Sequence, residues 1–335
     1  MKPLHTLAAD EYDDLFDCLS AVDKDPYVDY PAFSAAVHDL IDRNQVPKFF
    51  VQVCGRINNE RMSGESDIHV LRNCPIDREV PLFDQEDPVT DKYEKKKTFV
   101  GEAFLELFAQ LTGTPLLAYS TRNNGDFFHD VYAANRYSGT QTQKTDGELY
   151  FHNDRTAHPV RADFLALLGM RCPESDLVFT GYIDGRELLK HLSSAHQMAL
   201  RQPYFVTPFD RYSRDSNRGQ ETSENHAILE NDHSFRYYDT RTTVASGSPE
   251  VAKDALIALK DAIVRAEKQR HRILTKDLLV LANQDGLHSR DMIEINDPQG
   301  TRRRWLLKTY AFRDDEAAAV HDAVWLNGVR GRVGD

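Results

Sequence analysis

The sequence predicts an α+β, mainly β fold in which a sandwich or barrel of short strands is flanked by helices. Apolar residues recur at three- and four-residue spacing in the first third of the chain, which is the pattern of amphipathic helices. From about residue 115 onward, short β-rich runs alternate with turn signals, as is typical of sandwiches and barrels. The chain contains neither GxGxxG nor GxxxxGK[ST]. Dinucleotide-binding and P-loop folds are therefore disfavoured.

Length and charge restrict the class of protein. The chain has 335 residues and no composition boundary divides it, so we expect one domain over residues 1–335. Its 41 Lys and Arg residues against 53 Asp and Glu residues give a formal net charge of −12. That charge disfavours nucleic acids and anionic membranes as partners, because both are held by basic surfaces. Whether the chain forms a homo-oligomer is left open by its composition.

The expected location is the cytoplasm. No apolar run approaches the roughly 20 residues that cross a bilayer, and no signal peptide is visible at the N-terminus. The four cysteines are scattered and form no CxxC pair. The sequence therefore predicts reduced thiols rather than a disulfide scaffold or a zinc ribbon.

A mainly helical flank is predicted over residues 1–114. Its helices are assigned from apolar residues on one face, and the last helix ends at Gly113, a residue typical of helix C-caps. One β-rich run, bounded by Pro47 and Gly55, is interpreted as a buried strand. In chain order we expect helices at 11–22 and 30–43, that strand at 47–55, a loop at 75–97 and a helix at 98–113.

The predicted β core covers residues 115–312. The segment 207–235 is long, polar and without apolar periodicity, which is typical of a lid over a binding site. The run 250–270 is the clearest amphipathic helix and is inserted between strands. A C-terminal helix is expected over residues 313–335. The remaining elements are strands at 116–133 (broken by an Asn124-Gly125 turn), 148–154, 164–172, 176–184, 236–246, 277–290 and 302–313, and a helix at 186–201.

The tripeptide His152-Asn153-Asp154 is the first candidate for chemistry. Residues i and i+2 of a strand point to the same side, so His152 and Asp154 can bind one metal ion as neighbouring ligands. Two histidines and one carboxylate that leave three positions open form the non-haem Fe(II) arrangement. An oxoacid can take two of the open positions and O₂ the third.

The third ligand and the partners of the oxoacid are expected downstream. His288 follows an apolar run, and Arg304 lies in the next β-like run. An arginine there can hold the distal carboxylate of 2-oxoglutarate through a bidentate salt bridge, and Thr180 can donate a hydroxyl. Two alternatives stay open. His158 is a rival ligand, and a zinc hydrolase can be built on the first two ligands and His158, although it leaves the downstream pair without a role.

Two segments resemble the clavaminate-synthase-like group of Fe(II)/2-oxoglutarate oxygenases. Residues 150–172 contain the H-x-D motif, then HP-x-RAD and an apolar strand. Residues 286–310, from GLHSR to RRRWLLKTY, are similar to the family's distal histidine and its Arg-Trp-Leu segment. The resemblance covers roughly residues 115–312. It implies a double-stranded β-helix (jelly roll, cupin-like) core flanked by helices.

The resemblance also implies ligands and cofactors. His152, Asp154 and His288 match the iron ligands, although many members carry Glu in place of the aspartate. A carboxylate at that position argues against the related halogenases, which bind chloride there. Arg304 and Thr180 match the partners of 2-oxoglutarate. The implied cofactors are Fe(II), 2-oxoglutarate as cosubstrate, and O₂.

Three further positions are implied as substrate contacts. Asp239 falls where relatives place an acid at the polar end of the substrate, and a carboxylate suits a cationic side chain. On the residues alone, Asp239 is equally a surface aspartate paired with Arg236 or Arg241. Lys308 stands where several members have a second arginine that helps bind the substrate carboxylate. Asn124 lies in the loop that contacts the amino acid backbone in the family.

The predicted function is the hydroxylation of an unactivated carbon, C3 or C4, of free L-lysine, with release of succinate and CO₂. The predicted partner is thus a free basic amino acid. The same chemistry on free arginine, asparagine or a carrier-bound amino acid is one alternative. A metal-binding jelly-roll protein without oxygenase activity is the other.

Overall fold

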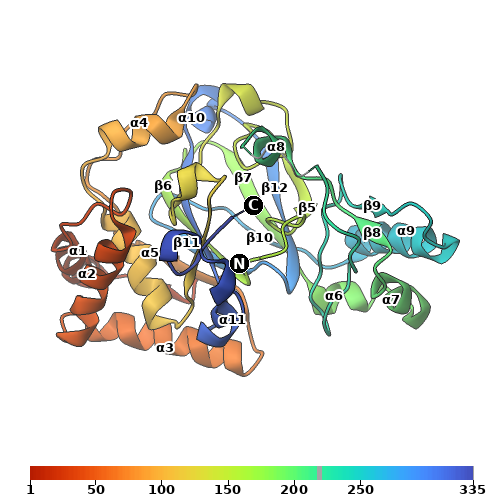
Figure 1. The fold of residues 1–335 in the computed structure, drawn as a ribbon. Helices are drawn as coiled ribbons and strands as arrows, with labels where there is room; N and C mark the ends of the chain where they lie inside the picture. The colour runs from red at the N-terminus through yellow and green to blue at the C-terminus, as the bar shows by residue number, and fades with distance from the viewer. Residues whose placement is uncertain (217–220, 335) are drawn as a thin grey trace.

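Two β-sheets lie at the centre of the molecule, and helices flank them on two sides (Figure 1). The computed structural model describes residues 1–216 and 221–334. One sheet is large and mixed, and the other is a small antiparallel sheet. This arrangement is a double-stranded β-helix, or jelly roll, flanked by helices, and it confirms the predicted fold class.

The large sheet contains eight strands and the small sheet four. The large sheet comprises β1 (His5–Thr6), β2 (His69–Arg72), β3 (Leu116–Tyr119), β4 (His129–Val131), β6 (Phe164–Arg171), β11 (Leu278–Ala282), β13 (Trp305–Ala311) and β14 (Arg332–Val333). The small sheet comprises β5 (Leu149–His152), β7 (Leu177–Asp184), β10 (Gln269–His271) and β12 (Gly286–Glu294). Their orders are β1-β2-β11-β6-β13-β3-β14, with β4 paired to β13, and β10-β7-β12-β5.

Alternating side chains of the large sheet enter two different cores. Leu168 of β6 and Leu307 of β13 belong to the core shared with the N-terminal helices. Their neighbours Leu167 and Leu306 belong to a second core, which Tyr182 of the small sheet joins. Successive residues of a strand point to opposite faces, so this pattern places the second core on the side of the sheet that faces β7.

Helices of the first third cover the outer face of the large sheet (Figure 1). The run 47–55, expected as a strand, is instead part of a helix that begins after Pro47. The buried residues of that helix recur at helical spacing over two turns. The run 47–55 is too short to reveal this period, so it was interpreted as a strand. A short helix also interrupts the loop expected at 75–97. The helices are α1 (Ala9–Ser20), α2 (Tyr30–Asp42), α3 (Lys48–Met62), α4 (Pro88–Lys95) and α5 (Val100–Leu111).

A second group of helices lies at the opposite side of the molecule (Figure 1). It consists of α6 (Gly185–Leu189), α7 (Ser194–Leu200) and α9 (Glu250–Arg265), which bury a third core together with Ile183 and Leu287 of the small sheet. The single helix expected at 186–201 is thus two helices. The inserted helix ends before residue 270, because 269–271 forms β10 and pairs with β7.

The expected lid segment, 207–235, contains one short helix, α8 (Arg211–Ser216). Residues 217–220 of this segment lie outside the described residues. The strand expected at 236–246 is mostly irregular: only β9 (Thr243–Val244) forms there, paired with β8 (Phe205–Val206). A single bridge joins Tyr238 to His152.

The C-terminal segment is not the helix expected over 313–335. It contains α11 (Asp315–Ala319), two 3₁₀ turns (Asp322–Val324 and Leu326–Gly328) and then β14, which pairs in parallel with β3. Residues near the C-terminus thus form a strand because they pair with the edge of β3. A last short helix, α10 (Pro298–Arg302), precedes β13. Across the described residues, we find no helix long and apolar enough to cross a membrane.

Candidate functional site

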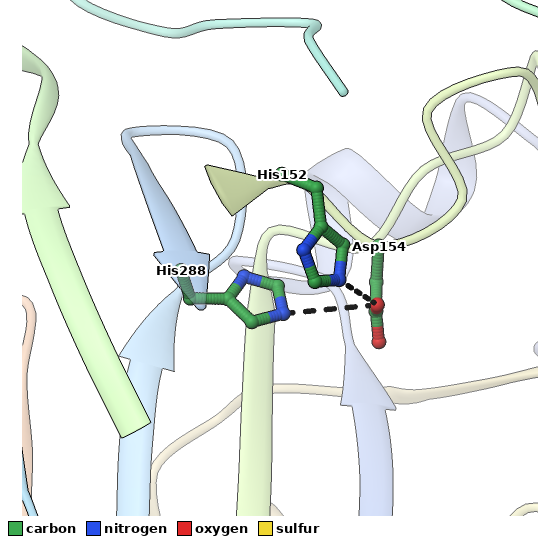
Figure 2. A group of neighbouring side chains, drawn as sticks. All are labelled: His152, Asp154 and His288. Atoms are coloured by element: carbon green, nitrogen blue, oxygen red, sulfur yellow. Dashed lines mark ion pairs between the residues drawn. The ribbon is translucent and has the colours of Figure 1, made fainter. Parts of the chain in front are cut away.

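Two histidines and one aspartate converge at one end of the small sheet (Figure 2). His152 is the last residue of β5, Asp154 follows in the next turn, and His288 lies in β12. Oδ1 of Asp154 is 3.3 Å from Nε2 of His152 and 3.7 Å from Nε2 of His288. The two imidazole ring centroids are 4.3 Å apart. The three residues predicted as a ligand set therefore lie together.

The pairing of β5 with β12 brings the two histidines together. His152 and His288 are direct partners in this antiparallel pair, so their side chains share one face. Asp154 is held by Asn283, whose Oδ1 accepts a hydrogen bond of 2.7 Å from the Asp154 backbone N–H. Asn153, between the two ligand candidates, donates to the Gly286 carbonyl at 2.8 Å. The turn carrying His152 and Asp154 is thereby tied to the β11–β12 connection.

Sequence reasoning passed over Asn153 and Asn283. Both are completely buried, and both use their amides on backbone groups. Asn153 Oδ1 accepts from the Tyr237 backbone N–H, and Asn283 Nδ2 donates to the carbonyls of Asp154 and Ala162. A buried amide must be hydrogen-bonded to be stable. The only signal in the sequence was the position of Asn153 between two candidate ligands.

The protonation states in this cluster suit metal binding. The partner of His152 Nδ1 is the Tyr150 carbonyl at 2.7 Å; because a carbonyl only accepts, Nδ1 carries the proton and neutral His152 presents a lone pair on Nε2. Burial lowers the pKa of His288 to about 4. Neutral imidazole is the form that binds metals. The donor set of two nitrogens and one oxygen therefore fits a divalent transition metal.

Asp154 carries a negative charge despite its burial. Burial by itself would raise the pKa of its carboxyl, but the Lys308 ammonium outweighs this, and the pKa lies well below its usual range. Nζ of Lys308 is 2.6 Å from Oδ2, and the Tyr310 hydroxyl donates to the same oxygen at 3.0 Å. The structure thus places Lys308, expected against a substrate carboxylate, on the aspartate itself.

A cavity adjoins the cluster, and most of its charged residues are arginines. Among its lining residues are Arg122, Arg155 and Arg241, with Asp210 as the carboxylate besides Asp154. Arg122 donates to Asp210 at 2.5 Å, and Arg241 lies 3.8 Å from it. These neighbours hold the pKa of Asp210 far below its usual value although burial opposes the shift. Sequence reasoning missed Arg122 and Asp210, since neither belongs to a recognisable motif.

Arg304 and Thr180 lie farther along the same barrel. Both are buried, and Arg304 lines a small cavity together with Arg290. Thr180 is the direct cross-strand partner of Arg290 in the β7–β12 pair, so the two side chains share a face. Burial, and then the charge of Arg304, lowers the pKa of Arg290 to about 10. Arg304, Arg290 and Thr180 together can bind a carboxylate. Arg290 was missed, although its spacing of two residues from His288 on one strand was a usable signal.

Asp239 and Asn124 do not line the cavity beside the cluster, as far as the described residues go. Asp239 Oδ1 accepts from Lys260 Nζ at 2.8 Å and from the Tyr237 hydroxyl at 2.6 Å. It therefore faces α9 rather than the two histidines, and neither Arg236 nor Arg241 is its recorded partner. Asn124 is exposed, has a positive φ and donates to the Tyr93 hydroxyl at 3.4 Å. In this structure both residues therefore have protein partners away from the cluster, and their expected substrate contacts stay predictions.

His158, the rival ligand, is engaged by the backbone. Its Nδ1 accepts from the Val160 N–H at 2.9 Å, and its Nε2 donates to the Gly334 carbonyl at 2.8 Å. Both ring nitrogens therefore have partners and neither is directed to the cluster. A zinc site built on His158 has no support from this geometry.

The fold and the cluster define a class: a jelly-roll protein with two histidines and one carboxylate at the mouth of the barrel, as in the non-haem iron oxygenases. The chain belongs to the taurine catabolism dioxygenase TauD, TfdA family, which matches residues 100–310. It is therefore an Fe(II)/2-oxoglutarate-dependent dioxygenase by family. The result agrees with the resemblance found in the sequence at the level of the superfamily.

Individual proteins similar to this chain include amino acid oxygenases. L-asparagine oxygenase of Streptomyces coelicolor is 28% identical over 256 residues, which are 76% of this chain and 73% of that protein. A structure of asparagine oxygenase with Fe(II), (2S,3S)-3-hydroxyasparagine and succinate has a TM-score of 0.80 at 21% identity and covers 98% of both chains. The non-haem iron oxygenase OrfP, in complex with Fe and α-ketoglutaric acid, has a TM-score of 0.76 at 18% identity, over 98% of this chain and 99% of OrfP. These structures support the shared fold.

Proposed function

We propose that this protein hydroxylates an unactivated side-chain carbon, C3 or C4, of a free L-amino acid, with Fe(II), 2-oxoglutarate and O₂. In this proposal His152, Asp154 and His288 hold the iron, and Arg304 and Thr180 hold the distal carboxylate of 2-oxoglutarate. The observation that carries it is the convergence of two imidazole nitrogens and one carboxylate oxygen beside a cavity lined by three arginines and Asp210. Membership of a dioxygenase family and the similarity to amino acid oxygenases support it.

The iron, when bound, would supply the activation of O₂ that oxidises 2-oxoglutarate to succinate and CO₂ and delivers one oxygen atom to the amino acid. The chain's own residues bind and orient the cosubstrate and the amino acid, and they exclude water. The guanidinium of Arg304, buried beside Arg290, offers a bidentate contact to a carboxylate. Phe209, Asp210 and Ser213, at and before the start of α8, line the cavity beside the cluster, and a substrate held there would keep one C–H bond near the metal.

The identity of the amino acid is the finer part of the proposal. L-Lysine was predicted from Asp239, and that argument loses its basis because Asp239 is paired with Lys260. Of the two carboxylates that line the cavity, Asp154 belongs to the cluster, and Asp210 is already neutralised by Arg122 and Arg241. A cationic side chain would compete with these arginines for Asp210, whereas a neutral amide can accept from an arginine and donate to the aspartate. This observation favours asparagine as a second candidate beside lysine, with arginine as a third.

A substrate panel tests the proposal. The purified protein is loaded with Fe(II) under anaerobic conditions and incubated with 2-oxoglutarate, ascorbate, O₂ and each free amino acid. We expect succinate, and a product heavier than one of the amino acids by one oxygen atom in mass spectrometry. The matched variant His152→Ala should remain folded and form no product. Turnover that is unchanged in this variant would refute the iron site.

The same purified protein also tests the remaining alternative, a metal-binding jelly-roll protein without oxygenase activity. A zinc hydrolase or a ligand-binding jelly roll would retain zinc or no metal after anaerobic purification and would not consume 2-oxoglutarate. Metal analysis together with succinate formation distinguishes these outcomes from an oxygenase. Iron-dependent consumption of 2-oxoglutarate without any hydroxylated free amino acid would keep the dioxygenase chemistry but exclude a free amino acid as the substrate.

A further inference from the structure

The two oxygens of the Asp154 carboxylate have different neighbours. Oδ1 faces the Nε2 atoms of His152 and His288, at 3.3 and 3.7 Å. Oδ2 accepts from the Lys308 ammonium at 2.6 Å and from the Tyr310 hydroxyl at 3.0 Å. We propose that Lys308, supported by Tyr310, is a positioning residue that orients Asp154 so that Oδ1 is directed at the metal. The inference rests on the proposed metal-binding function of the cluster.

Lys308 has no donor left for another partner. A lysine ammonium has three N–H groups, and Lys308 uses them on Asp154 Oδ2, on Gln143 Oε1 at 2.6 Å and on the Tyr310 hydroxyl at 2.8 Å. The side chain is 3% exposed, so water does not compete for these contacts. The role expected from the resemblance, a hydrogen bond to the substrate carboxylate, would require one of these contacts to break.

The sheet aligns the two donors. Lys308 and Tyr310 are two residues apart in β13 and therefore point to the same face. Lys308 is the cross-strand partner of Leu167 in β6 and of His129 in β4. With strands on both sides, its backbone cannot shift without disturbing the centre of the large sheet. The ammonium is thus held at a fixed position relative to Asp154.

Orientation matters for a carboxylate ligand because the terminal torsion of aspartate is broad and roughly two-fold. Without a partner on one side, either oxygen can face the histidines, and the carboxylate is free to rotate. Two donors on Oδ2 remove this freedom and leave the lone pairs of Oδ1 available. Groups that orient metal ligands in this way typically change metal affinity by roughly 10- to 100-fold when they are removed.

Metal affinity, measured without substrate or cosubstrate, tests the proposal. Fe(II) is titrated anaerobically into wild type, Lys308→Met, Tyr310→Phe and the control Lys253→Met, which removes an exposed lysine paired with Glu250 on α9. We expect the dissociation constant to rise by roughly 10- to 100-fold in Lys308→Met and by less in Tyr310→Phe. The control should match wild type. Circular dichroism and thermal unfolding of the metal-free proteins verify that each variant is folded.

Different results identify which idea fails. If folded Lys308→Met binds Fe(II) within twofold of wild type while its KM for the amino acid rises, Lys308 is a substrate contact and the positioning role is overturned. If Lys308→Met does not fold, Tyr310→Phe decides: an unchanged dissociation constant there overturns the proposal. If wild type itself binds no Fe(II), and His152→Ala behaves the same, the proposed function fails as well.

Discussion

His152 and His288 are direct partners across β5 and β12, although most of the β core separates them in the chain. Their ring centroids lie 4.3 Å apart, and both Nε2 atoms face Oδ1 of Asp154. A shift of one residue in this register would turn one imidazole to the other face of the sheet. The geometry of the cluster therefore depends on strand pairing more than on the local sequence around either histidine.

Replacing Arg304 should weaken the binding of 2-oxoglutarate. Arg304 is buried in the small cavity shared with Arg290, where a salt bridge to a carboxylate is little screened. We expect Arg304→Ala to raise the half-saturating concentration of 2-oxoglutarate by roughly 10- to 100-fold, the equivalent of one or two charge-assisted hydrogen bonds. Steady-state succinate formation measures it. The neighbouring Arg303 is exposed, so Arg303→Ala is the control, and equal behaviour of the two variants would refute the assignment.

Replacing Asp239 should leave turnover intact. Its carboxylate is paired with Lys260, and the two side chains are 27% and 46% exposed. We expect Asp239→Asn to retain kcat and KM for the best amino acid and to lose less than about 1 kcal/mol of stability, as is usual for exposed pairs. Asp210→Asn, in the cavity wall, should instead raise KM by roughly tenfold, the loss of one hydrogen bond to a charged group. The reverse order of effects would return Asp239 to the substrate site.

Replacing Asn283 should destabilise the protein. Its side-chain amide accepts a hydrogen bond from the Asp154 backbone N–H and donates to the backbone carbonyls of Asp154 and Ala162. Asn283→Ala leaves these buried groups without partners, and we expect the free energy of unfolding to fall by about 3 kcal/mol. Urea denaturation of the metal-free protein measures it. Asn231→Ala, at an exposed position, serves as the comparison, and a similar small loss in both variants would contradict the structural role.

Stability should depend on pH through His226. Burial, and then the charge of Arg236, lowers the pKa of His226 to about 4. The unfolded state, with an ordinary histidine pKa near 6.5, then binds more protons between these values. The free energy of unfolding associated with this residue therefore rises with pH, and falls by about 1.4 kcal/mol per unit on acidification within the window.

The variant His226→Gln isolates this contribution. Other groups act in the opposite sense: burial raises the pKa of Glu102 to about 7, so its contribution to stability is lost as pH rises. Such contributions are the same in wild type and His226→Gln, so they cancel in the difference between the two free energies of unfolding. We expect that difference to change across pH 4 to 6.5, as measured by urea denaturation at several pH values. His38→Gln, which changes an exposed histidine, should track wild type, and parallel curves for His226→Gln would contradict the shifted pKa.

Periodicity predicted the helical flank and the later strands, because both patterns depend on neighbouring residues in the chain. It failed for residues 47–55, where an apolar run was too short to distinguish a strand from a turn of α3. It failed again at the C-terminus, where β3 recruits 332–333 as a strand. At the C-terminus a tertiary contact outweighed local preference.

The sequence alone determined the ligand candidates and the fold class. The spacing of His152 and Asp154, and the motif blocks around His288 and Arg304, carry that information locally. Only the tertiary structure decided which partners Lys308 and Asp239 contact. On the sequence alone, Lys308 and Asp239 can each pair with several oppositely charged groups. Which partner is met depends on strand register and on the face to which each side chain turns, and these follow from the packing of the whole barrel.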